Sequence, residues 1–75
     1  MNSSQCKQLS NLIDQLSDIR QDLESIRDEE DEKFNNLPEG LQQSSTGEAL
    51  EQSVQQLEEA VQQIEEAISA LEEIS

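Results

Sequence analysis

The sequence predicts an all-α fold, an antiparallel helical hairpin of two long helices with a short ordered connection. In both halves of the 75-residue chain, apolar residues recur at alternating spacings of three and four, which indicates amphipathic helices. The segment between them holds the only Phe, the only Pro and one of two Gly residues. We expect a single domain, 1–75, with helix one at about 4–33, a connection at 34–46 and helix two at about 47–74.

The first helix is predicted from its apolar seam, the line of residues that faces a partner helix. Residues 2–4, an Asn and two Ser, are good N-caps. The seam consists of Leu9, Leu12, Leu16, Ile19, Leu23 and Ile26, with Ile13 at a flanking position. Beyond it the helix is charged, and we expect support from the pairs Arg27–Asp31 and Glu29–Lys33, each worth about 0.2 to 0.5 kcal/mol.

The connection is expected to be ordered. Pro38 suits the first position of a short helical turn. An apolar plug over the open end of the helix pair is expected from Phe34, Leu37 and Leu41. Ser45 and Glu48 match the S-x-x-E capping box, so helix two should begin near Gly47.

The second helix contains three consecutive copies of a seven-residue unit, SVQQLEE, AVQQIEE and AISALEE, over residues 53–73. Its seam consists of Leu50, Val54, Leu57, Val61, Ile64, Ile68 and Leu71. The flanking heptad position is occupied by Ser53, Ala60, Ala67 and Ile74. Three apolar positions in seven are typical of a helix in a bundle and exceed the two of a simple coiled coil.

A lone hairpin of this length buries little apolar surface, and chains this short usually need a partner for stability. The oligomer interface is predicted at Ile13, Ala60, Ala67 and Ile74, which would form a second apolar strip left exposed on a monomer. We therefore predict that two hairpins pair into a homodimeric four-helix bundle.

The charge balance restricts the class of partner. Eighteen acidic and four basic residues give a net charge of −14, which argues against direct nucleic-acid binding and against attachment to an anionic membrane. A basic or helical surface of another protein is the natural complement. No stretch approaches the roughly 18 to 20 apolar residues of a membrane span, and the start lacks the regions of a secretion signal. We expect a cytoplasmic protein.

The side-chain inventory predicts no enzyme. The chain has no His, which removes the commonest general base and the commonest metal ligand, and its one cysteine, Cys6, has no catalytic companion. Gly40 and Gly47 do not form a phosphate-binding spacing. We expect no catalytic residue, no metal and no cofactor.

The most conspicuous polar feature is a glutamate ridge on the second helix. It consists of Glu58, Glu59, Glu65, Glu66, Glu72 and Glu73, three pairs each seven residues apart. No Lys or Arg follows Lys33, so helix two has no cation of its own to neutralise these charges. One interpretation is a solvated acidic face. The other is a partner-binding ridge of carboxylates that imitates a phosphate backbone and occupies a basic channel.

The run from Ser25 to Ile74 resembles a group of small acidic hairpin proteins encoded by bacteriophages and prophages. The connection carries the most specific part of the resemblance, at Phe34, Asn36, Leu37, Pro38, Leu41, Gln42, Ser44, Gly47 and Glu48. The resemblance implies a protein made inside a bacterial host cell during phage infection. Small acidic phage proteins of this kind include inhibitors of host nucleic-acid-handling and defence machinery, some of them DNA mimics. No site residue is carried over from the group.

Two functions remain open from the sequence. The first is a non-enzymatic, phage-type inhibitor that binds a host or defence-system protein through its acidic helical surface, with the exposed acids of helix one contributing. The second is a structural or adaptor module that recruits a partner helix through its apolar seam. Salt should weaken the first kind of binding and not the second.

Overall fold

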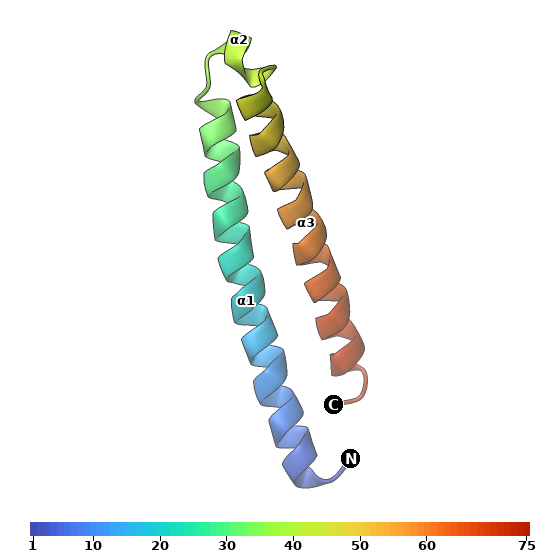
Figure 1. Ribbon diagram of the computed structural model, residues 1–75. Helices are drawn as coiled ribbons and strands as arrows, with labels where there is room; N and C mark the ends of the chain where they lie inside the picture. Colours follow the sequence, from blue (N-terminus) through green and yellow to red (C-terminus); the bar gives the residue numbers. More distant parts are fainter.

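The computed structural model describes residues 1–75 and consists of three helices without a strand. Two long helices, α1 (Ser3–Asn35) and α3 (Ser45–Glu72), run antiparallel side by side, and the short α2 (Glu39–Gln42) closes one end (Figure 1). The molecule measures 58 × 15 × 12 Å, and both termini lie at the end opposite α2. The predicted all-α helical hairpin is confirmed.

Helix α1 begins at a reciprocal cap. The Asn2 side-chain Oδ1 accepts a hydrogen bond of 2.8 Å from the Gln5 backbone N–H, and Gln5 Oε1 accepts one of 3.0 Å from the Asn2 N–H. This capping box satisfies two backbone donors that the first turn of a helix leaves free. The helix continues to Asn35, two residues past the predicted end.

The charged end of α1 is paired differently from the prediction. Arg27 donates to Asp28 at 3.1 Å, and Lys33 donates to Glu30 at 3.1 Å. The predicted pairs of Arg27 with Asp31 and of Glu29 with Lys33 are therefore wrong. Residues three apart are neighbours on a helix as well as residues four apart, so spacing alone does not select the partner.

The Gln42 side chain links the two sides of the connection. Gln42 Nε2 donates to the backbone oxygens of Phe34, at 3.4 Å, and Leu37, at 3.2 Å. Phe34 and Leu37 are half-buried, as expected for the apolar plug, but Leu41 remains 51% exposed and does not join it. Pro38 precedes α2 as its N-cap instead of occupying its first position.

Helix α3 begins two residues before the predicted start and uses a different cap. Ser44 is the N-cap: its hydroxyl accepts from the Gly47 N–H at 3.4 Å and donates to the Leu41 carbonyl. The predicted capping box of Ser45 with Glu48 is wrong. Gly47 is buried against the backbone of Gln42, and this close approach positions the start of α3 one residue earlier than the S-x-x-E motif suggests.

The core is a single thin layer between α1 and α3. Its buried apolar residues are Leu9, Val61 and Ile68, and none of them is completely enclosed. The predicted seam of α3 is otherwise half-buried along its length. A chain with so few buried side chains gains little from burial within one hairpin.

The face that α1 turns toward α3 differs from the prediction. The predicted seam residues Leu12, Ile19 and Ile26 are 45%, 47% and 46% exposed. The heptad position of Ile13 is half-buried instead, and it continues through Arg20 and Arg27, which are half-buried as well and have long aliphatic stems that can cover apolar surface. The α1 helix is thus rotated about its axis, and one apolar row remains outside the hairpin core.

Candidate functional site

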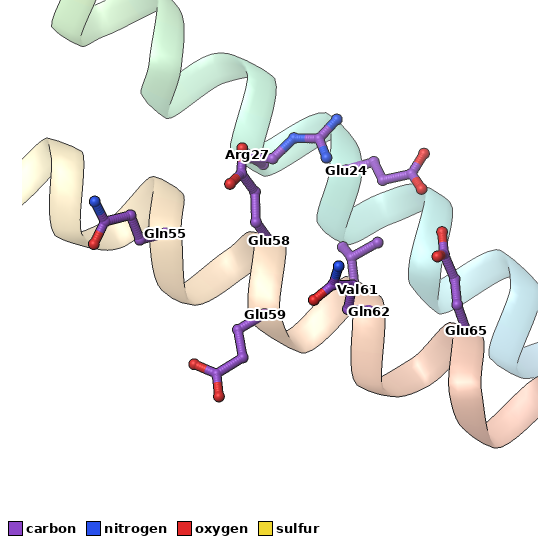
Figure 2. Close-up of a pocket in the computed structure, with 8 residues that line it drawn as sticks. All are labelled: Glu24, Arg27, Gln55, Glu58, Glu59, Val61, Gln62 and Glu65. Atoms are coloured by element: carbon purple, nitrogen blue, oxygen red, sulfur yellow. The ribbon is translucent and has the colours of Figure 1, made fainter.

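The candidate site is a shallow groove between the middle of α3 and α1, which we call the acidic groove. It is lined by Glu24 and Arg27 of α1 and by Gln55, Glu58, Glu59, Val61, Gln62 and Glu65 of α3. Figure 2 shows Glu58 and Glu65 reaching toward α1, whereas Glu59 points away from it. A second hollow continues the groove toward the C-terminal end of α3, because Gln62 and Glu65 line both.

The seven-residue repeat arranges the glutamates in two rows. At about 100° per residue, Glu58 and Glu65 lie on one edge of the α3 face, and Glu59, Glu66 and Glu73 lie about 100° further round. Between the rows lie neutral side chains that line the two hollows: Gln55, Gln62 and Ser69. The groove therefore has a floor of hydrogen-bonding groups and two acidic edges.

The groove carries an excess of negative charge. Its only cation is Arg27, and that guanidinium is hydrogen-bonded to Asp28 through Nε at 3.3 Å and Nη2 at 3.1 Å. No ion pair joins Arg27 to a glutamate of α3, and α3 itself contains no Lys or Arg. A cationic group on another molecule would therefore meet carboxylates that no internal ion pair occupies.

Most of the predicted partner-binding residues lie together in this region. Glu58, Glu59 and Glu65 line the first hollow, and Glu66 and Glu73 line the second. Glu72 lines neither hollow. The sequence-based prediction missed Glu24 and Arg27, because their place on the groove depends on the register between α1 and α3.

The predicted oligomer-interface residues are divided among environments. Ile13 and Ala60 are half-buried, whereas Ala67 is exposed and Ile74 is 61% exposed. Ile13 shares a heptad position with Arg20 and Arg27, on the side of α1 that packs against α3. The residues that remain outside the core on α1 are those of the exposed row at Leu12, Ile19 and Ile26, which the prediction had placed inside the hairpin.

The structure also bears on metal binding, on the free thiol and on membrane-spanning segments. No three His, Cys, Asp or Glu side chains converge in an arrangement that could hold a metal ion. Cys6 is an exposed free thiol near the start of α1. Neither long helix contains a stretch long and apolar enough to cross a membrane. The acidic groove is the main polar concave feature of the chain.

Comparisons of the chain with models of known protein families, with curated proteins and with solved structures gave no match. The resemblance to small acidic proteins of bacteriophages and prophages therefore stays a prediction.

Proposed function

We propose that this protein is a non-enzymatic binding protein that attaches to a basic surface of another protein through the acidic groove. The observation that carries the proposal is the separation of charge between the helices. All four cations belong to α1, whereas α3 has carboxylates only and exposes them along a groove with a neutral floor. A basic helix or a basic nucleic-acid channel is the complementary surface.

The spacing of the carboxylates supports imitation of a nucleic-acid strand. The six glutamates from Glu58 to Glu73 occupy about 23 Å of helix axis at 1.5 Å per residue. They provide one negative charge per about 4 Å, close to the value of about 3.4 Å for one strand of B-DNA. A partner whose basic groups follow a phosphate backbone would find a similar charge density here. We infer that the protein inhibits a nucleic-acid-handling or defence protein of a bacterial host cell, in the cytoplasm.

We further propose that the functional unit is a homodimeric four-helix bundle. The thin core of the single hairpin supports this proposal, because Leu9, Val61 and Ile68 are its only buried apolar residues. Chains of this size rarely bury enough apolar surface alone.

The test is capture of bacterial proteins on the immobilised chain at about 50 mM and about 300 mM salt, followed by affinity measurement with each captured protein. The informative variant replaces Glu58, Glu59, Glu65 and Glu66 by Gln. Exposed ion pairs contribute about 0.5 kcal/mol each, so the loss of four should weaken binding by about 2 kcal/mol, or about thirtyfold. Higher salt should weaken the unaltered protein in the same direction.

A matched control removes the same charge elsewhere. Asp14, Asp18, Glu29 and Glu32 are exposed on α1 and make no side-chain hydrogen bond or ion pair within the chain. Their replacement by Asn and Gln should leave most of the affinity, because the groove is unchanged. Equal losses in both variants would show that net charge alone attracts the partner and would refute the groove.

A second function is favoured by a different observation. The exposed row at Leu12, Ile19 and Ile26 is a helix face without a partner inside the hairpin. An adaptor module would use such a face to recruit an amphipathic helix. Binding of that kind would tolerate salt, survive the four glutamate substitutions and be lost on Ile19→Asp.

A further inference from the structure

Helix α1 carries a row of exposed apolar side chains outside the hairpin core. Leu12, Ile19 and Ile26 are spaced by seven residues, so they lie on one side of the helix. Each is almost half exposed, although each belongs to the apolar pattern of the sequence. A row of three large apolar side chains along about 21 Å of helix is an unusual feature on a surface that is otherwise strongly acidic.

Helix α3 contributes a complementary row on the same side of the hairpin. Around the axis of α3, Gln62, which lines the acidic groove, is rotated about 100° from Val61 in one direction. Ala60 is rotated about 100° from Val61 in the opposite direction. Around the axis of α1, Glu24, which also lines the groove, is rotated about 100° from Leu23 in one direction. Ile26 is rotated about 60° from Leu23 in the opposite direction. Both rows therefore lie on the face opposite the acidic groove, which we call the back face.

The two rows are also level with each other. Glu24 of α1 and Gln62 of α3 line the same groove, so they lie at about the same height along the antiparallel helices. Ile26 lies two residues after Glu24, and Ala60 lies two residues before Gln62. Because the helices are antiparallel, both steps go in the same direction along the hairpin, so Ile26 and Ala60 also lie at about the same height. Steps of seven residues give two levels that each combine a large residue of α1 with a small residue of α3: Ile26 with Ala60, and Ile19 with Ala67. Leu12 continues the row of α1 toward the end of the hairpin where α3 ends, at Glu72.

The elongated hairpin exposes more surface than a compact monomer of the same mass. A folded monomer of 8.5 kDa is expected to expose about 4,650 Å². The hairpin exposes 5533 Å². The difference of about 880 Å² is close to the roughly 800 Å² that each partner contributes to a standard protein interface.

The charge distribution selects the occupant. On the back face, α3 presents only uncharged residues: Ala49, Ser53, Gln56, Ala60, Gln63 and Ala67. The rim of the back face on α1 is acidic: Asp22 and Glu29 flank the exposed row, and Glu30 is paired with Lys33 at 3.1 Å. Two chains of net charge −14 can therefore meet along this face while most of their carboxylates point away from each other. A basic partner would find more carboxylates in the acidic groove, where Glu58, Glu59 and Glu65 lie together.

We propose that the occupant is a second copy of this chain, related by a two-fold axis that runs parallel to the helices. This orientation keeps the two levels aligned, so that Ile26 and Ile19 of one copy pack on Ala60 and Ala67 of the other. Large side chains then face small ones, which fills space well in a bundle core. The inference rests on the proposed homodimer and adds its face, its orientation and its contacts.

The alternative orientation places the axis perpendicular to the helices. Ile19 would then meet Ile19, and Ala67 would meet Ala67. Large residues would crowd on one side of the interface, and small ones would leave space on the other. The two connections would lie at opposite ends of the bundle, whereas in the proposed dimer they lie at the same end.

The native Cys6 distinguishes these orientations in the unaltered protein, because it is the only cysteine and is exposed. A nitroxide on each Cys6 allows the distance between copies to be measured by pulsed electron paramagnetic resonance. The proposed dimer has both labels at one end, about 20 to 30 Å apart across the bundle. The alternative separates them by at least about 39 Å along the axis. The longer distance, or no dipolar signal at all, would overturn the proposal.

Disulfide trapping tests the contacts themselves in chains that carry Cys6→Ser. Under mild oxidation, a mixture of an Ile19→Cys chain and an Ala67→Cys chain should give a covalent dimer that contains one of each. The Ile19→Cys chain alone should cross-link at least tenfold more slowly. Equal rates would indicate the alternative orientation and contradict the proposal.

A point substitution tests whether the face holds a second copy or another protein. Ile19→Asp should halve the mass measured by light scattering at micromolar concentration, whereas Gln21→Asp, on the outer side of α1, should leave it unchanged. If the unaltered protein is already a fully helical monomer, the proposal fails and the back face belongs to a different partner. Neither substitution touches the acidic groove, so loss of the dimer and loss of basic-partner binding are separate outcomes.

Discussion

Replacing Gly47 by Ala should destabilise the protein, whereas replacing Gly40 by Ala should not, although both glycines lie in helices next to the connection. A Cβ built on Gly47 would lie 2.8 Å from Gln42 Cα and closer still to the Gln42 carbonyl group. These are backbone atoms, which cannot rotate away as a flexible side chain would. A Cβ at Gly40 would meet nothing within 4 Å.

The magnitude at Gly47 follows from the contacts that a shift would break. Moving the connection away from α3 disturbs the Ser44 cap on the Gly47 N–H, worth about 1 kcal/mol. It also disturbs the bonds from Gln42 to Phe34 and Leu37, worth about 1 kcal/mol each. The higher helix propensity of Ala returns about 1 kcal/mol. The expected net loss is about 2 kcal/mol, while Gly40→Ala should gain about 0.5 to 1 kcal/mol.

The assay is thermal unfolding followed by circular dichroism, with all proteins at one concentration because the proposed dimerisation would make the midpoint depend on concentration. For a domain of this size the midpoint should fall by about 8 to 16 °C for Gly47→Ala. It should rise by a few degrees for Gly40→Ala. A Gly47→Ala protein as stable as the unaltered one would refute the close approach of α3 to the connection.

Three further predictions concern the core, the first cap and the net charge. Val61→Ala should cost about 2 kcal/mol in urea unfolding because Val61 is the most buried apolar residue, at 5% exposure, whereas exposed Gln62→Ala should change stability by less than about 0.5 kcal/mol. Asn2→Ala should cost about 1 kcal/mol and speed amide hydrogen exchange in the first turn of α1, and unchanged exchange there would contradict the capping box. Raising salt from about 10 to about 300 mM should raise the thermal midpoint, because it screens the repulsion among charges that sum to −14, and a midpoint that falls would contradict this reasoning.

Hydrophobic periodicity predicted the hairpin and the face of α3 but could not choose the face of α1. Helix α1 carries apolar residues at three heptad positions, represented by Leu9, Leu12 and Ile13. Any two neighbouring positions form an acceptable stripe, and the sequence favours the stripe with more apolar residues. In the hairpin, Arg20 and Arg27 take part in the inner face because long aliphatic stems can cover apolar surface. Only the packing of both helices determines this choice.

Neither the cap at the start of α3 nor the wall that α1 gives to the acidic groove could be predicted from local sequence patterns. The choice between Ser44 and Ser45 as N-cap depends on where Gln42 and Gly47 meet, which no local motif contains. Likewise the seven-residue repeat placed the glutamates together on α3, but the opposite wall at Glu24 requires the register of the two helices. Local patterns predicted local features here, and contacts between distant segments required the folded chain.

The placement of the two faces links the proposed dimer to the proposed binding function. The acidic groove and the back face lie on opposite sides of one hairpin, so pairing through the back face leaves each groove uncovered. In the proposed four-helix bundle the two grooves point away from each other, on opposite sides of the bundle. A partner with two basic sites, or a basic filament flanked by two dimers, could then engage more than one groove and gain avidity without any new contact. The same separation explains how so acidic a chain can associate with itself: the carboxylates that attract a basic partner are those that the dimer keeps apart.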